Sequence, residues 1–405
     1  MSQHIQHQVD QLLLEQGEYL PLEFLLQEGR LLYADYETWR NGGLDTLDEA
    51  LFGDPEHIQQ QLMQAENYLQ QRGWQAETIS YPAWESENTT SRPLCFSTNK
   101  KLDLCFHRRY HKPQNQPQMD LFTDAPATNL VNGIIQALIN RNSAEARRLL
   151  ERLYDTAPDH ARLGELECLV EAAEDLNTPV TDAAAELKTL QKSLAPLAET
   201  LLGKDSRNLL IPLWRRLSSA LQDQQYQASL PELHLSYTAA QAMDWEAARQ
   251  MVEQEPRWQA DPILLLRHAQ ACEQLHLQPK ALLSWFNLCW QFPQQCDALE
   301  SSSDHPLRQQ WIAFQELEPE LPVQSFPAWL LLSKPGLTRL LPEPGSISGN
   351  NEMLYPASYL TLFRLQHNRL NSHAKHGNEK TMTLRAQLKQ QDPALFQHYL
   401  GNIDA

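Results

Sequence analysis

A helix-sized segment that opens on alanine and closes at proline recurs three times in this chain. Ala146 to Pro158 and Ala281 to Pro293 have the same twelve-residue separation, and Ala248 to Pro256 is one helical turn shorter. Proline ends such a helix because it lacks an amide donor and clashes with the preceding turn. The starts at Ala248 and Ala281 are 33 residues apart. This spacing predicts helical hairpins that stack on one another over residues 124–341.

These segments resemble the second helix of a tetratricopeptide repeat (TPR), whose period is about 34 residues. The resemblance rests on Asp-Trp-Glu-Ala-Ala at 244–248 and Gln-Pro-Lys-Ala-Leu at 278–282. The signature of the first repeat helix is missing, and residues 176–224 are irregular. The resemblance implies a TPR-like α-solenoid whose extended groove holds a protein partner, which the sequence does not identify.

Composition favours a mainly α protein. Only 14 of the 405 residues are glycine, whereas leucine, alanine, glutamine and glutamate are abundant. Glycine serves tight turns, and the abundant residues lose little conformational entropy in a helix. Hydrophobic residues make up 42% of the chain, which is enough to bury a core. The length exceeds what one ordinary core supports, so we expect two or three parts.

Residues 1–112 predict a small α+β domain ahead of the array. Apolar residues at helical spacing predict one helix that ends at Gly17 and a second that stops at Gly73. After Gly73 the spacing of apolar residues changes. Two short apolar runs flank a polar Thr-Asn-Lys-Lys stretch, and they predict a β-hairpin near 94–107.

Two polar, proline-containing stretches separate the remaining parts. Residues 113–123 begin with Pro-Gln-Asn-Gln-Pro-Gln, and prolines among amides favour an extended linker. A second stretch at 342–351 is rich in glycine, proline, serine and asparagine. Beyond it, residues 352–405 predict a C-terminal helical cap that folds back on the array.

The end of the first linker carries a short motif, Gln118-Met119-Asp120-Leu121-Phe122. It resembles the peptide by which bacterial replication and repair proteins bind the β sliding clamp. That peptide has glutamine, an aliphatic residue, serine or aspartate, leucine and phenylalanine, and all five positions match when Met119 is taken as aliphatic. The resemblance covers five residues and implies the β sliding clamp as a partner.

The residues of this motif suit docking into an apolar groove. Leu121 and Phe122 would enter the groove as anchors supported by Met119, while Gln118 and the backbone form hydrogen bonds and Asp120 stays solvated. A structural alternative remains open. Thr123 or Asp124 could cap the next helix, and Leu121 and Phe122 would then staple the start of that helix to the array.

The net charge of −18 argues against a chain that coats nucleic acid over its whole length. Locally, Arg108, Arg109 and Lys112 lie just upstream of the motif, and one interpretation is a weak contact to clamp-encircled DNA. The alternative is that they form a solvated face. Aromatic residues Tyr33, Tyr36 and Trp39 fall at i, i+3 and i+6, which predicts a helical core stripe or a base-stacking platform.

No catalytic motif, metal-ligand set or phosphate-binding loop is recognisable, so we expect no cofactor. The six cysteines are scattered without a CxxC pair, and no signal peptide or membrane-length apolar run is visible. These features favour a reducing cytoplasm, and the resemblance to the clamp-binding peptide implies a bacterium.

Three functional hypotheses follow. The first is a non-enzymatic adaptor that docks on the sliding clamp and scaffolds a replication or repair partner. The second is a TPR-like interaction scaffold or assembly factor unrelated to DNA. The third is an enzyme whose site is assembled from residues distant in sequence, which spacing alone does not reveal.

Overall fold

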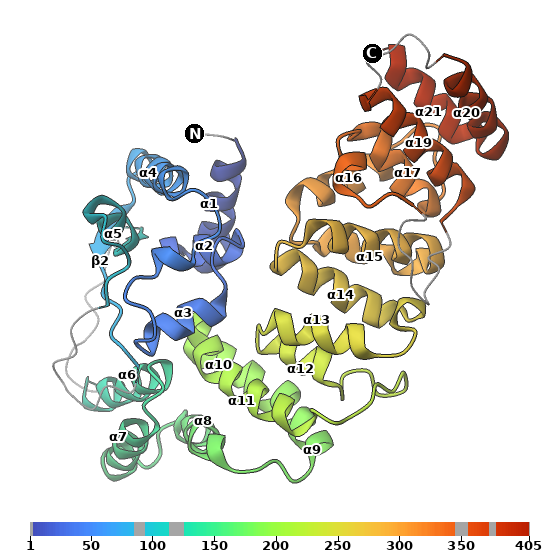
Figure 1. Cartoon of the computed structure of the whole chain (residues 1–405). Coiled ribbons are helices and arrows are strands. Elements are labelled where there is room, and N and C mark those ends of the chain that lie inside the picture. The colour runs from blue at the N-terminus through green and yellow to red at the C-terminus, as the bar shows by residue number, and fades with distance from the viewer. Residues whose placement is uncertain (1–2, 85–93, 113–124, 345–354, 372–377, 405) are drawn as a thin grey trace. The chain divides into compact units, whose positions relative to one another are not determined.

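The computed structural model describes residues 3–84, 94–112, 125–344, 355–371 and 378–404 (Figure 1). Within these ranges nearly every element is a helix, and the strands are few and short. The expectation of a mainly α protein is confirmed. The chain forms two compact units, one of residues 1–224 with 241–244, and one of residues 225–240 with 245–405.

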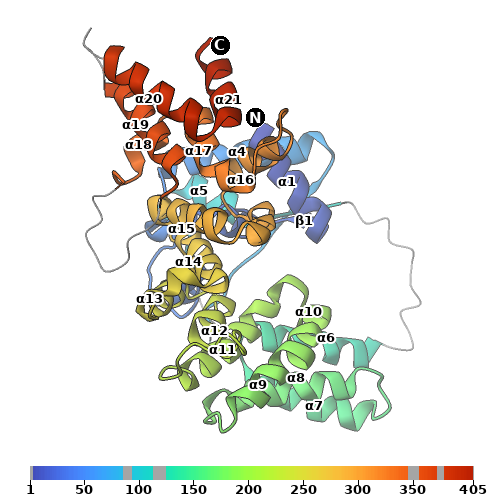
Figure 2. The ribbon, with the colours of Figure 1, turned by 90° about the vertical axis from the view of Figure 1, so that its right-hand side faces the viewer.

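The first unit contains helices α1 to α11 and a small sheet. Its helices are α1 (Gln3–Gln16), α2 (Pro21–Gln27), α3 (Tyr33–Arg40), α4 (Pro55–Gln71), α5 (Lys100–Phe106), α6 (Ala125–Ile139), α7 (Ser143–Thr156), α8 (Leu163–Glu174), α9 (Ala183–Thr189), α10 (Ala195–Leu202) and α11 (Ser206–Ala220). A π-helical turn, Leu190–Leu194, joins α9 to α10. In Figure 2, α6 to α11 lie together as one group of helices.

The two predicted N-terminal helices are present as α1 and α4. Helix α4 buries Ile58, Leu62, Ala65 and Leu69, the stripe that its sequence spacing predicts. Its start is fixed by Asp54, whose side chain accepts a hydrogen bond from the His57 amide at 3.2 Å. A helix of this kind is stable because its apolar face is covered, with propensity as a smaller contribution.

The sheet is three-stranded, with the order β1-β3-β2 and antiparallel pairing throughout. Its strands are β1 (Glu18–Tyr19), β2 (Gln75–Thr78) and β3 (Arg108–His111). The central strand, β3, is the last of the three in sequence. Its pairing with β1 brings together segments that are about ninety residues apart. Tyr110 of β3 is buried opposite Tyr19.

The predicted β-hairpin at 94–107 is wrong, because residues 100–106 form helix α5. The Asn99 side chain caps this helix by accepting a hydrogen bond from the Lys101 amide at 3.0 Å. Leu102, Leu104 and Phe106 alternate as in a strand, but only Leu102 and Phe106 are buried, and Leu104 is 59% exposed. Burial therefore follows the i, i+4 spacing of a helix. A short apolar run fits both the strand period and the helix period. Here the Asn99 cap and the packing of Leu102 and Phe106 select the helix.

The aromatic stripe of α3 belongs to the core. Tyr33, Tyr36 and Trp39 are each at most 2% exposed, so the core prediction is confirmed and a base-stacking platform at these residues is excluded. The Tyr33 hydroxyl donates a hydrogen bond of 2.6 Å to the side chain of Asn208 in α11. This contact joins two helices that are 175 residues apart in sequence.

A buried carboxylate connects α3 to the later helices of the same unit. Glu37 is 6% exposed and accepts hydrogen bonds from Arg141 at 2.5 Å and from Arg215 at 2.6 Å. Burial opposes ionisation of this carboxyl, but the bonds from Arg215 and Arg141 outweigh it and hold its pKa below the usual value. A parallel pair joins Arg207 of α11 to Glu23 of α2. Paired in this way, the buried charges stabilise one arrangement of the helices.

In the second unit, the regular elements of the described residues are all helices. Its helices are α12 (Leu235–Gln241), α13 (Trp245–Gln254), α14 (Pro262–Gln274), α15 (Gln278–Gln291), α16 (His305–Gln315), α17 (Phe326–Ser333), α18 (Leu337–Leu340), α19 (Ala357–Asn371), α20 (Asn378–Gln391) and α21 (Pro393–Asp404). Figure 1 shows α13, α14 and α15 stacked in sequence order.

The three recurring segments of the sequence are all helices. They are α7, α13 and α15, and each ends before the proline that was expected to close it. Helix α14 begins where Asp261 accepts hydrogen bonds from the amides of Ile263 and Leu264, with Pro262 in the first turn. Caps and prolines thus set the helix boundaries in this unit.

The longest apolar run of the sequence forms α17, the centre of the second core. Its residues 326–332 are all buried, and α15, α16, α19 and α21 pack around it. A helix that is apolar on every side needs this kind of enclosure. Among the described helices, none combines the length and the apolar character that crossing a membrane requires.

The buried pair at Glu37 makes a prediction about stability. Glu37→Gln keeps the shape of the side chain and leaves two arginines facing a neutral group, so we expect the free energy of unfolding to fall by about 3 kcal/mol. Chemical denaturation measures this change. Glu174→Gln is the matched control, because Glu174 pairs with Arg147 at 2.5 Å but is 37% exposed, and its loss is expected to be below about 1 kcal/mol. Equal losses would contradict a special role for Glu37.

Candidate functional site

The five residues of the clamp-like motif, at 118–122, lie outside the described residues. The described chain ends on one side at Lys112, after β3, and resumes on the other at Ala125, the first residue of α6. The motif is therefore bounded by an element of the sheet and by a long helix. Whether Leu121 and Phe122 pack against that helix stays an open prediction.

The three basic residues upstream of the motif are described, and two of them are paired. Arg108 pairs with Glu66 of α4, and Arg109 lies 2.9 Å from Glu77 of β2. Lys112 is exposed and lies over the ring of Trp74, with its Nζ atom 5.6 Å from the ring centre. Phosphate groups would have to compete with carboxylates for both arginines, so Lys112 is the most available of the three cations.

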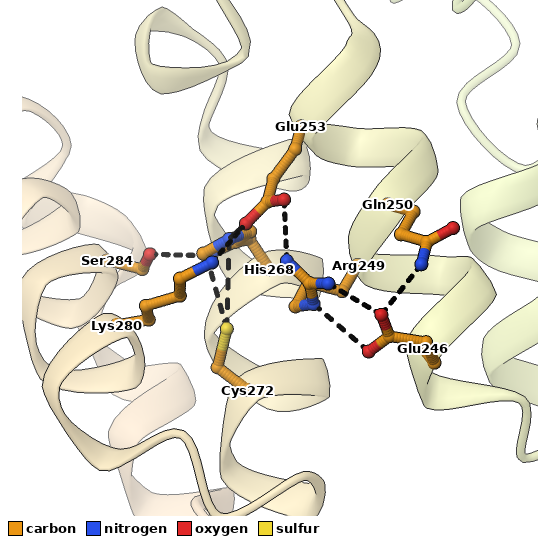
Figure 3. A network of polar contacts seen from close by, with 8 residues as sticks. All are labelled: Glu246, Arg249, Gln250, Glu253, His268, Cys272, Lys280 and Ser284. Carbon is orange, nitrogen blue, oxygen red and sulfur yellow. Dashed lines mark hydrogen bonds and ion pairs between the residues drawn. The ribbon is translucent and has the colours of Figure 1, made fainter.

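A polar network links three helices of the second unit around Glu253 (Figure 3). The Glu253 carboxylate accepts hydrogen bonds from Arg249 of α13 at 2.6 Å and from Lys280 of α15 at 3.0 Å. The ring of His268, in α14, lies 3.2 Å away. Partial burial raises the pKa of Glu253, but the bonds from His268, Lys280 and Arg249 outweigh it and lower this pKa to about 2. The group is therefore a carboxylate at any physiological pH.

His268 occupies the middle of this network and is 3% exposed. An ionised carboxylate has no proton to give, so the proton on the ring is at Nε2 and donates to Glu253. Nδ1 then accepts a hydrogen bond of 2.7 Å from the Ser284 hydroxyl. Burial is the largest cause that lowers the pKa of His268, so the ring is neutral near pH 7. Trp258 packs against the ring with 4.3 Å between centres and its plane tilted by 31°.

Serine, histidine and glutamate in a hydrogen-bonded chain are the groups of a hydrolytic triad. A triad acts only when its nucleophile can reach a substrate carbonyl. Ser284 is 3% exposed, and the other nucleophile beside the ring, Cys272, is completely buried. Burial also raises the pKa of the Cys272 thiol to about 12, which keeps it protonated. The arrangement holds helices α13, α14 and α15 together and offers no access for catalysis.

A pocket of about 700 Å³ lies at the other end of this unit, beside α19 and α20. Its polar lining includes Arg364, His367, Gln387 and Glu343. Histidine and glutamate are residue types that hydrolytic sites use, but the described lining residues include no serine or cysteine, and their hydroxyl group is that of Thr383. Within the described residues, no three side chains of histidine, cysteine, aspartate or glutamate gather as metal ligands would.

Sequence reasoning did not find the Glu253 network. Its members are 15 and 16 residues apart, which no short motif spans. One signal was present, because Ser284 interrupts an apolar run inside a predicted helix. A polar residue at a buried helical position needs a partner from another element, but the sequence does not name that partner.

No protein-family model, curated protein or solved structure matches this chain. Its functional assignment therefore rests on the residues and the geometry described above.

The Glu253 network predicts unequal effects for two glutamates that contact the same arginine. Glu253→Gln removes charged bonds from three helices, and we expect the free energy of unfolding to fall by about 2 kcal/mol. Glu246→Gln is the matched control, since Glu246 also binds Arg249 but is 49% exposed, and within the described part of the chain its side chain bonds only to residues of α13. Its expected loss is about 0.5 kcal/mol or less. Denaturant unfolding followed by tryptophan fluorescence measures both, and a larger loss for Glu246→Gln would contradict this account.

Proposed function

We propose that this protein is a non-enzymatic adaptor that docks on the β sliding clamp and holds a replication or repair partner on its helices. The observation that carries the proposal is the match of residues 118–122 to the clamp-binding pattern at all five positions. The stretch before it, with two prolines, restricts the backbone and so reduces the entropy that docking removes.

The chemistry of the motif accounts for binding without catalysis. Leu121 and Phe122 are large apolar anchors that fill a pocket, and anchors of this kind dominate the energy of peptide interfaces. Gln118 and the backbone supply hydrogen bonds that fix the direction of the chain. Asp120 stays at the solvated rim, where a charge adds specificity rather than affinity.

The helical part supports the scaffolding half of the proposal. Helices α13, α14 and α15 follow one another at the spacing that the repeating sequence predicts. We propose that residues 124–341 form a TPR-like solenoid, with residues 1–112 as an α+β domain and residues 352–405 as the cap. Such an array presents an extended surface made of helix faces, which suits a protein partner.

A weak DNA contact is part of the proposal. Lys112 is exposed and Arg108 and Arg109 lie beside it in sequence, so a strand that passes through a clamp would meet positive charge next to the motif. The contact is expected to be weak because Glu66 and Glu77 already pair with the two arginines.

The second candidate is a helical scaffold with no link to the clamp. It is favoured by the net charge of −18 and by the pairing of the two arginines with carboxylates. In that case Leu121 and Phe122 would staple the start of α6 to its neighbours. The two candidates differ in what the loss of these side chains does to binding and to stability.

The test is a binding measurement between the intact protein and a purified bacterial β clamp. Isothermal titration calorimetry is expected to show binding of the intact protein and of a peptide of residues 113–124. Leu121→Ala with Phe122→Ala is expected to weaken binding by about 100-fold or more, because both anchors are lost. Met119→Leu is the matched control and keeps the affinity.

The same variants decide between the candidates. The adaptor proposal predicts that the double variant unfolds at the same temperature as the parent protein. A fall of about 4 °C or more in Tm, together with unchanged or absent clamp binding, would identify a helix staple and overturn the proposal.

A further inference from the structure

Two buried histidines of the second unit have the same set of partners. His234 is completely buried and His268 is 3% exposed. Each ring places Nδ1 near a serine hydroxyl, at 2.8 and 2.7 Å, and Nε2 near a glutamate carboxylate, at 3.2 Å in both cases. The partners are Ser236 and Glu255 for His234, and Ser284 and Glu253 for His268.

Both glutamates lie at the same place in the fold. Glu253 is in the last turn of α13, and Glu255 follows directly after that helix ends. His234 immediately precedes α12, whereas His268 lies in the middle of α14. The end of α13 is thus held from two sides, by one histidine from each of the neighbouring helical segments.

The backbone fixes His234 in its neutral form. The Ser236 amide donates to Nδ1 at 3.3 Å, and the Ser236 hydroxyl lies near the same nitrogen. A backbone N–H cannot reverse its role, so Nδ1 must remain an acceptor and Nε2 carries the proton that faces Glu255. A second proton, on Nδ1, would point at the Ser236 amide and disrupt the start of α12.

Neighbouring charges act on both rings in opposite directions, because the two glutamates favour protonation and the nearby cations oppose it. Glu253 already binds Arg249 of α13 and Lys280 of α15, so a charged His268 would be a third cation at one carboxylate. Near His234, the Arg267 guanidinium of α14 bonds Ser236 at 3.1 Å. Tyr226 packs edge-on against the His234 ring, and its amide donates to Glu255 at 3.1 Å. Burial is the largest cause that lowers the pKa of both histidines and these cations add to it; together they outweigh Glu255 and Glu253, which raise it.

We propose that the two Ser–His–Glu chains form an acid-sensitive latch that holds α12 and α14 to the end of α13 and opens when the rings are protonated. The latch lies in the stack of helices that scaffolding would use. It is independent of the clamp motif, which is on the other unit.

The direction of the pH effect follows from the two states of each ring. Both histidines have a folded pKa below the ordinary value of 6.5. Their stabilising contribution is therefore complete above pH 6.5, and it is lost as the pH falls below 6.5 toward the folded pKa. In that window each histidine lowers the folding equilibrium constant by at most about tenfold for each pH unit.

Hydrogen exchange of the full-length parent protein tests the latch without any substitution. Exchange at pH 7.0 and pH 5.5, corrected for the intrinsic rate, is expected to show loss of protection over residues 226–285. Helix α4 and its neighbours in the first unit are expected to stay protected. Equal protection of residues 226–285 at the two values of pH would overturn the proposal.

Substitutions then assign the effect to the two rings. His234→Gln with His268→Gln is expected to remove most of the pH dependence of unfolding between pH 7 and pH 5, although the variant is less stable at pH 7. His57→Gln, at an exposed position of α4, is the matched control and keeps the dependence of the parent protein. If the double variant keeps that dependence, or does not fold while NMR of the parent shows both rings titrating near 6.5, the proposal is wrong.

Discussion

The first unit depends on one buried carboxylate, Glu37, and on the arginines that neutralise it. A charge in the protein interior is tolerated only when opposite charges and hydrogen bonds surround it, and Arg141 and Arg215 supply both. Because Glu37 is in α3 while its partners come from the α6–α7 turn and from α11, these three charges specify how three distant segments meet. The Tyr33–Asn208 bond and the pairing of Glu23 with Arg207 act at the same junction. The sheet and helices α1 to α5 are connected to the later helices through it.

In the second unit, neutral histidine rings connect the helices in place of paired charges. Polar side chains within apolar helices must find partners on other helices, and His234 and His268 each find a serine and a glutamate. The bonds are directional, so they fix which face of α13 meets α14 more narrowly than apolar packing alone does. The consequence is a helix stack whose order rests partly on two groups that acid can charge. Under the proposed function, the surface of this stack would carry the protein partner, while the clamp motif is in a different part of the chain.

Much of the helical architecture could be predicted from the sequence, because apolar spacing and proline are local signals. The stripe from Ile58 to Leu69 and the segments that became α7, α13 and α15 are examples. Residues 100–106 were misassigned because three apolar residues at a spacing of two also fit a helix, and the Asn99 cap decides. The pairings of Glu37 and His268 could not be predicted. These pairings depend on which distant helices pack together, and a local sequence pattern does not indicate which helices do so. The motif at 118–122 is the reverse case, a local signal whose surroundings the structure does not describe.

The central claim is that Phe122 contacts the clamp and not the protein's own helices. A photoreactive phenylalanine analogue at position 122 of the full-length chain, irradiated in the presence of purified β clamp, tests it directly. The account predicts a covalent adduct with residues that line the apolar peptide pocket of the clamp, and loss of the adduct when an excess of the 113–124 peptide competes. Crosslinks confined to the protein's own helices, such as α6, would contradict the account and identify residues 121–122 as a structural staple.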